Sequence, residues 1–171
     1  MCQDTERVYI YLELEPYLRQ WLINDNGGET PVVFRKYSIE NRILKIYLIP
    51  LPPNAVPNLP SETSVAIVIP EYPGGDPKRV NYLPVAAMKE LHDCIRERFL
   101  IELWTDLHQF GHIGKRRDKL IEAWMEAHGI VVNDTNFNTL AKIYQRQHKA
   151  YTARVRRAKK SSKKSRKKSG T

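Results

Sequence analysis

The chain has 171 residues, a net charge of +9 and a hydrophobic share of 42%. This length suits one domain with an appendage, and the hydrophobic share is sufficient for a core, which excludes disorder of the whole chain. The two cysteines offer neither a metal-type spacing nor a disulfide framework, and no apolar run is long enough to cross a bilayer. Because the sequence also lacks a signal peptide, we expect a cytoplasmic protein in a reducing compartment.

The first half of the chain predicts a small mixed layer of strands and short helices. Strands are expected at three segments rich in β-branched and aromatic residues: 8–14, 32–34 and 64–69. The third is a continuous apolar run, which favours a central position. Short helices are expected at two segments with helix-start residues: 17–23, after Pro16, and 39–48, after the capping residue Ser38. A strand through the second of these is an open alternative. Residues 50–62 contain five prolines and predict an extended loop.

The second half of the chain predicts three helices. Apolar residues recur at spacings of three and four over 84–110, which indicates one long helix. A helix over about 115–128 follows, with Gly129 in the position of a terminating glycine. After a short turn, a last helix runs into the basic C-terminal segment, and Asp134 or Thr135 is expected to cap it.

This last helix is amphipathic, and its two sides are the main functional signal of the sequence. At about 100° per residue, Leu140 and Tyr144 fall on one side, and Lys142, Arg146 and Lys149 fall on the opposite side. One side can pack against the protein while the other contacts phosphates. The two final helices are helix-turn-helix-like, because their turn is longer than that of the strict motif.

If this pair of helices binds duplex DNA, polar residues early in its second helix, Asn136 among them, should contact bases. Asn and Gln pair bidentately with adenine, and Arg pairs with guanine. Basic residues further along, and at the start of the first helix, should contact phosphates. The residues predicted to bind nucleic acid are Lys115, Arg116, Arg117, Asn138, Lys142, Gln145, Arg146, Lys149, Arg154, Arg156, Arg157, Lys159 and Lys160.

The positive charge is concentrated at the C-terminus. Residues 152–171 contain ten Lys or Arg and no acid, and subtracting those ten charges from +9 leaves −1 for residues 1–151. Such asymmetry indicates a polyanionic partner, most simply nucleic acid. Residues 158–171 are too charged and too poor in apolar groups to fold by themselves, so a disordered tail is expected. The tail has no aromatic residue or leucine to insert into lipid, which disfavours a membrane partner.

No catalytic, metal or cofactor site is predicted. His108 and His112 share a helix face, but no HExxH signature surrounds them. Glu97, Glu102 and Asp106 lie along one helix without an acidic strand beside them. We therefore expect these acids to be solvated or paired with arginines of the same helix. An enzyme of the nuclease type is the minor alternative.

Two segments of the chain resemble small basic proteins encoded by phages and transposable elements of gut bacteria. The first is the run LWTDLHQFGHIGKRRDKLIEAWMEAHGI from Leu103, together with NFNTLAKIYQRQHKAY. The second is the opening VYIYLELEPYLRQWL, together with NYLP at 81–84. The resemblance implies a mobile-element setting in a bacterial host and a DNA-binding, helix-turn-helix-like C-terminal part. It brings no catalytic motif and no site residues.

The sequence therefore predicts an α+β protein with three regions: a small α+β layer with proline-rich loops (1–83), a helical DNA-binding-like region (84–157) and a disordered basic tail (158–171). We expect a regulatory or accessory factor that binds double-stranded DNA, with the first region serving in homodimerisation or partner binding. Two alternatives stay open. One is RNA binding by the same basic surface, and the other is a structural or protein-interaction component whose tail only keeps it soluble.

Overall fold

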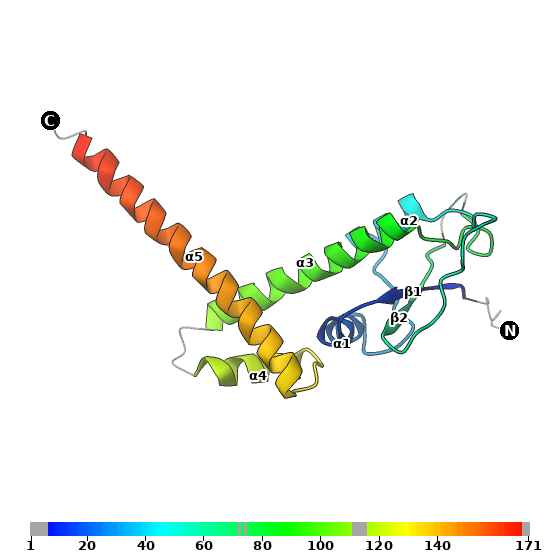
Figure 1. Ribbon diagram of the computed structural model, residues 1–171, viewed down its shortest axis with the longest axis horizontal. Coiled ribbons are helices and arrows are strands. Elements are labelled where there is room, and N and C mark those ends of the chain that lie inside the picture. The colour runs from blue at the N-terminus through cyan, green and yellow to red at the C-terminus, as the bar shows by residue number, and fades with distance from the viewer. Residues whose placement is uncertain (1–6, 72, 74, 111–115, 169–171) are drawn as a thin grey trace.

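The long helix α3 is the central element of the fold. The computed structural model describes residues 7–71, 73, 75–110 and 116–168. Its elements follow in the order β1 (Tyr9–Glu13), α1 (Pro16–Asp25), α2 (Ile39–Tyr47), β2 (Ser64–Val68), α3 (Val85–Phe110), α4 (Arg117–Ala127) and α5 (Asp134–Lys168). The sheet, α1 and α2 lie along the first part of α3, and α4 and the start of α5 lie at its other end (Figure 1). The predicted α+β class is confirmed.

The sheet consists of β1 and β2, which pair antiparallel with Ile10 opposite Ile67. Alternate residues of a strand point to the same face, so Ile10 and Leu12 enter the core together with Val65 and Ile67. The strand predicted at 32–34 is wrong. Only Val32 pairs, through one parallel bridge to Ile67, because the chain turns at 36–38 before α2 begins. The segment β2 thus lies between β1 and Val32, in the expected central position.

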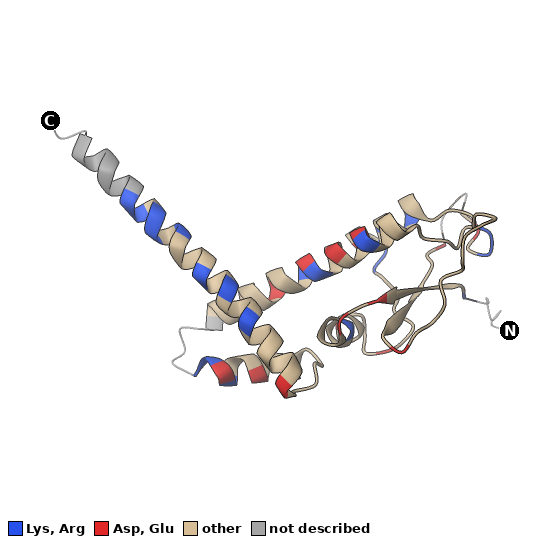
Figure 2. Ribbon diagram, viewed as in Figure 1, with Lys and Arg blue, Asp and Glu red and all other residues tan. Residues whose placement is uncertain are grey.

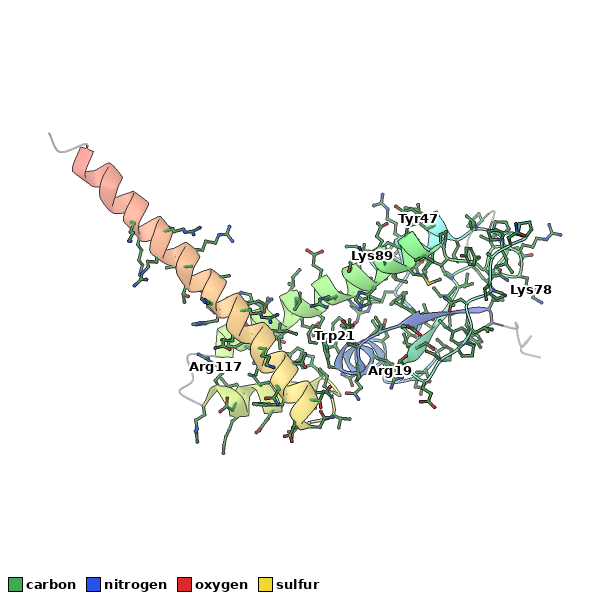
Figure 3. All side chains as sticks on the ribbon, in the orientation of Figure 1. Arg19, Trp21, Tyr47, Lys78, Lys89 and Arg117 are labelled. Atoms are coloured by element: carbon green, nitrogen blue, oxygen red, sulfur yellow. The ribbon has the colours of Figure 1, made fainter. Side chains whose placement is uncertain are left out.

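Aromatic side chains join the two ends of the core. Trp21 of α1 is fully buried on the side of α1 that faces α3 (Figure 3). Its ring and that of Phe99 form an edge-to-face pair with a centroid distance of 5.4 Å. Phe99 also contacts Tyr17 of α1 at 5.2 Å and Trp124 of α4 at 5.7 Å. One buried ring on α3 therefore connects the N-terminal layer to the C-terminal helices.

The segment at 39–47 is a helix, not the alternative strand, and Ser38 caps it as predicted. The Ser38 hydroxyl oxygen accepts a hydrogen bond from the Asn41 backbone N–H at 3.1 Å. Glu40 in the first turn is only 3% exposed, and its carboxylate lies 2.8 Å from Nε of Arg98 on α3. Arg98 also contacts Asp25 of α1 at 2.6 Å, so a single guanidinium group links α1, α2 and α3. A buried carboxylate is tolerated here because a cation neutralises it.

A glycine lies just after the end of α4, and an asparagine caps the start of α5. Gly129 has a φ of +68°, a value that favours glycine, and a Cβ atom at this position would lie 2.8 Å from the Asn24 side chain. The expected cap of α5 at Asp134 or Thr135 is wrong. The cap is Asn133, whose side-chain oxygen accepts from the Asn136 backbone N–H at 2.8 Å.

The helix α5 does not end before the basic tail. It continues as one helix through Lys168. The predicted disorder of the tail is therefore wrong for residues 158–168, which are helical. A helix that is already nucleated by packed turns gains one backbone hydrogen bond for each added residue, and Ala, Lys and Arg favour helix. Among the residues that the structure describes, no helix is both long and apolar enough to cross a membrane.

Candidate nucleic-acid interface

One side of the first half of α5 packs on the protein. Tyr144 is buried, and the Gln147 side-chain amide donates to the Leu100 carbonyl oxygen of α3 at 3.2 Å. The ring of Trp104 on α3 lies 5.8 Å from that of Tyr144 and 5.5 Å from that of Tyr151. These contacts hold α5 across the end of α3, on the side that the amphipathic pattern predicted.

The opposite side of the same helix carries exposed cations. Lys142, Arg146 and Lys149 are all exposed, as predicted. Helical spacing places Arg156 and Lys160, also exposed, on the same line. These five residues are termed the basic stripe, which extends about 27 Å at 1.5 Å per residue. Figure 2 shows the cations following α5 away from the rest of the chain.

The second half of α5 projects from the molecule. After Val155, which is half-buried, every described side chain through Lys160 is exposed. Figure 1 shows this part of the helix extending beyond the end of α3. At 100° steps, Arg154 and Lys159 lie off the basic stripe on opposite sides and Arg157 lies at its margin, so cations point to several sides of the projecting helix. All the predicted binding residues of this segment are therefore exposed to solvent.

The start of α4 adds a smaller positive area. Arg116 and Arg117 are exposed, and the Arg117 guanidinium lies 5.8 Å from the centre of the Tyr144 ring, beside α5. The later turns of α4 carry exposed acids (Figure 2), so its positive charge is confined to the first turn. Lys115, which belongs to the same predicted set, lies outside the described residues.

Asn136, in the first turn of α5, faces the protein and not the solvent. Asn136 is 3% exposed, and its side-chain amide donates to the Val131 carbonyl oxygen at 2.9 Å. Gln20 of α1 accepts from the Val131 backbone N–H at 3.0 Å and so docks the turn on α1. The prediction that Asn136 contacts bases is therefore wrong. Asn138 and Gln145, the other predicted amides, are exposed.

Arg96 and Arg98 of α3 pair with acids of other segments, whereas the sequence had offered pairing with acids of α3 as one of two alternatives to be tested, the other being solvation. Arg96 contacts Glu15 at 3.2 Å, and Arg98 contacts the acids of α1 and α2 described above. His92 lies 3.0 Å from the same Glu15 carboxylate. Burial acts to raise the pKa of Glu15, but hydrogen bonds from its own backbone and His92, with the charges of His92 and Arg96, hold that pKa below its usual value.

Sequence reasoning missed a group of side chains at the base of α5. Glu102 and Asp106 of α3 meet His128 at the end of α4, and one polar atom from each lies within 4.8 Å of the others. The spacing of four between the two acids is visible in the sequence. The histidine follows more than twenty residues later on another helix, so only tertiary packing brings it to them.

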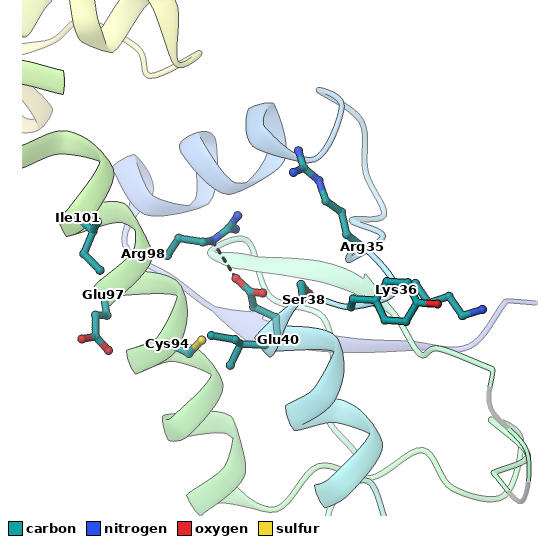
Figure 4. Close-up of a pocket in the computed structure, with 10 residues that line it drawn as sticks. Arg35, Lys36, Ser38, Glu40, Cys94, Glu97, Arg98 and Ile101 are labelled. Atoms are coloured by element: carbon teal, nitrogen blue, oxygen red, sulfur yellow. Dashed lines mark ion pairs between the residues drawn. The ribbon is translucent and has the colours of Figure 1, made fainter. Parts of the chain in front are cut away.

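A separate pocket of about 770 Å³ lies between α2 and α3, and Arg98 reaches Glu40 at its edge (Figure 4). Ile39 and Ile101, both well exposed, add apolar surface to it. Burial, and next the negative charge of Glu40, raise the pKa of the Cys94 thiol in this pocket. A raised pKa lowers the fraction of the reactive thiolate at neutral pH.

Comparison of the chain with protein-family models, with curated proteins and with solved structures found no match in any of the three. The charge, exposure and packing of α5 and the residues around it are therefore the features of this chain that bear on its function.

Proposed function

We propose that the protein binds double-stranded DNA through α5, as a regulatory or accessory factor of a phage or another mobile element. The observation that supports this function is the basic stripe, which is exposed opposite the packed side of α5 and continues onto a projecting, cation-rich end. Lys and Arg side chains that neutralise phosphates release condensed counterions, and this release supplies sequence-independent affinity for a duplex.

The projecting end of α5 suggests how the duplex is held. The major groove of B-DNA admits an α-helix, which then has phosphates on both sides. A helix inside the groove can use cations on several of its sides. A helix that lay on the outer surface of the duplex would need cations on one side only. The proposed mode is therefore a continuous basic helix crossing the groove, with Asn138 and Gln145 near its base as candidates for contacts with adenine. It differs from a helix-turn-helix, in which the first turn of the second helix reads the bases.

We infer that the protein binds DNA as a homodimer. One basic helix contacts only a short stretch of duplex, and DNA-binding proteins commonly dimerise so that the two chains bind two half-sites. An uncovered apolar surface on α2 supports it: Ile39 and Ile46 are 67% and 58% exposed, and the neighbouring Tyr37 is 91% exposed. Light scattering after size-exclusion chromatography should give the mass of two chains, and Ile46→Lys should give the mass of one. A single-chain mass for the unmodified protein would remove the dimer from the proposal.

Binding is tested by fluorescence anisotropy with a labelled random-sequence duplex. The full chain is compared with a chain that ends at Tyr151, at about 50 and about 200 mM salt, the range in which multi-phosphate contacts lose most affinity. We expect the full chain to bind with a steep salt dependence. The shortened chain keeps Lys142, Arg146 and Lys149 and should bind more weakly, with a shallower dependence.

The same titrations with single-stranded DNA and double-stranded RNA decide between ligand classes. Tighter binding to A-form RNA or to a single strand would replace DNA by RNA as the partner. If truncation abolishes binding, the packed half of α5 is not part of the interface. If no nucleic acid binds even at low salt, the structural or protein-interaction alternative takes the place of this proposal.

A further inference from the structure

Two acids of α3 and the residue that directly follows α4 converge beside the base of α5. Glu102 and Asp106 are four residues apart on α3, so both side chains point to the same face of the helix. His128 follows α4 directly and brings its Nε2 atom to 3.1 Å from a Glu102 carboxylate oxygen and 3.7 Å from an Asp106 carboxylate oxygen. The three side chains are partly buried, with exposed fractions between 21% and 33%. A small ion can therefore reach them from solvent.

Groups outside this cluster fix the direction of its donor atoms. The Nδ1 atom of His128 lies 2.8 Å from the Trp124 carbonyl oxygen, and that oxygen can only accept. Nδ1 therefore carries the hydrogen. The Trp124 indole N–H donates to the Asp106 carboxylate at 2.9 Å, and its ring stacks on the His128 ring at 4.0 Å. Metal-binding histidines and carboxylates in proteins are held by supporting contacts of this kind.

With the hydrogen on Nδ1, the Nε2 atom of His128 is the ring nitrogen that faces the two carboxylate groups. The Nε2 atom and one oxygen of each carboxylate lie within 4.8 Å of one another, an arrangement that ligand atoms adopt around a metal ion. We propose that a divalent transition-metal ion is bound here by Glu102, Asp106 and His128.

The ligand chemistry selects the class of ion. One imidazole nitrogen and two carboxylate oxygens form a set that Zn²⁺ and similar transition metals accept, whereas Mg²⁺ and Ca²⁺ prefer oxygen ligands alone. Three protein ligands leave at least one coordination position for water or a phosphate oxygen. The bound ion joins α3 to α4 at the point where α5 begins. This site is independent of the proposed DNA binding.

Isothermal titration calorimetry of Zn²⁺ into the chelator-treated full chain tests the site. We expect one ion per chain, binding that is lost in Glu102→Gln and Asp106→Asn, and much weaker binding of Mg²⁺. Trp124→Phe keeps an aromatic ring but removes the supporting N–H, so it should weaken Zn²⁺ binding by about tenfold. The control variant Glu122→Gln removes an exposed acid of α4 and should leave the affinity unchanged.

Circular dichroism shows whether each variant is folded, and a measurement on the unmodified chain makes the test independent of the variants. In nitrogen-15 NMR spectra, Zn²⁺ should shift the imidazole signals of His128 and leave those of His92, which contacts Glu15, in place. Three results overturn the site: no Zn²⁺ binding tighter than about 1 mM, unchanged binding in the folded Glu102→Gln variant, or no shift at His128. The last two would mean that the ion binds elsewhere, and the first would mean that the three side chains contact one another without an ion.

Discussion

Replacing the exposed cations on the packed half of α5 measures how much of the interface lies there. The variant carries Lys142→Gln, Arg146→Gln and Lys149→Gln. All three side chains are exposed, so the changes should alter stability by no more than about 0.5 kcal/mol each. If each contacts one phosphate, the slope of log affinity against log salt becomes shallower by about 2.7, at 0.9 for each contact.

That change in slope corresponds to a factor of about 40 over a fourfold change in salt. The variant should bind a duplex more weakly than the unmodified chain at 50 mM salt, and the difference should shrink by about 40-fold at 200 mM. The assay is fluorescence anisotropy at several salt concentrations. A matched control removes the same charge from the far end of the molecule, with Arg42→Gln, Arg79→Gln and Lys89→Gln (Lys89 is labelled in Figure 3).

The control variant should keep the slope of the unmodified chain, because its cations lie away from α5. Equal changes in both variants would show that only net charge matters and would refute the basic stripe as a contact surface. An unchanged slope in the α5 variant would restrict binding to the projecting end.

Three further predictions concern stability. Phe99→Ala empties the centre of the aromatic core and should lower the free energy of unfolding by about 3–5 kcal/mol in urea titrations; a loss below about 1 kcal/mol would mean that the core does not depend on this ring. Asn133→Ala removes the cap of α5 and should cost about 1 kcal/mol, whereas Thr135→Ala should be close to neutral, and the reverse order would contradict the observed cap. The lowered pKa of Glu15 means that its contribution to stability is present at neutral pH and is lost as pH falls below the ordinary value of 4.5. Glu15→Gln should therefore flatten the acid side of the stability profile, by less than about 1 kcal/mol because the pair is partly exposed; an acid side as steep as that of the unmodified chain would contradict this role.

Features that depend on neighbouring residues could be predicted from the sequence. The helices, β1, β2 and the cap at Ser38 follow from periodicity and from side chains a few residues apart. The exposure of Lys142, Arg146 and Lys149 opposite Tyr144 also follows, because the angle between side chains on a helix is fixed by its geometry. The same local rules did not predict that α5 would continue beyond residue 157. The tail was judged by its own composition, whereas its helix is nucleated by the packed turns that precede it.

What depends on distant partners was decided by the tertiary structure. Asn136 is polar and early in its helix, but docking of the turn onto Gln20 buries it. Val32 lies in a β-rich segment, but it makes only one bridge because the chain turns away. The meeting of Glu102 with His128 depends on how α4 packs against α3. Local sequence determines which side of an element is apolar or charged, whereas the burial and pairing of a side chain depend on residues that the chain brings to it from far away.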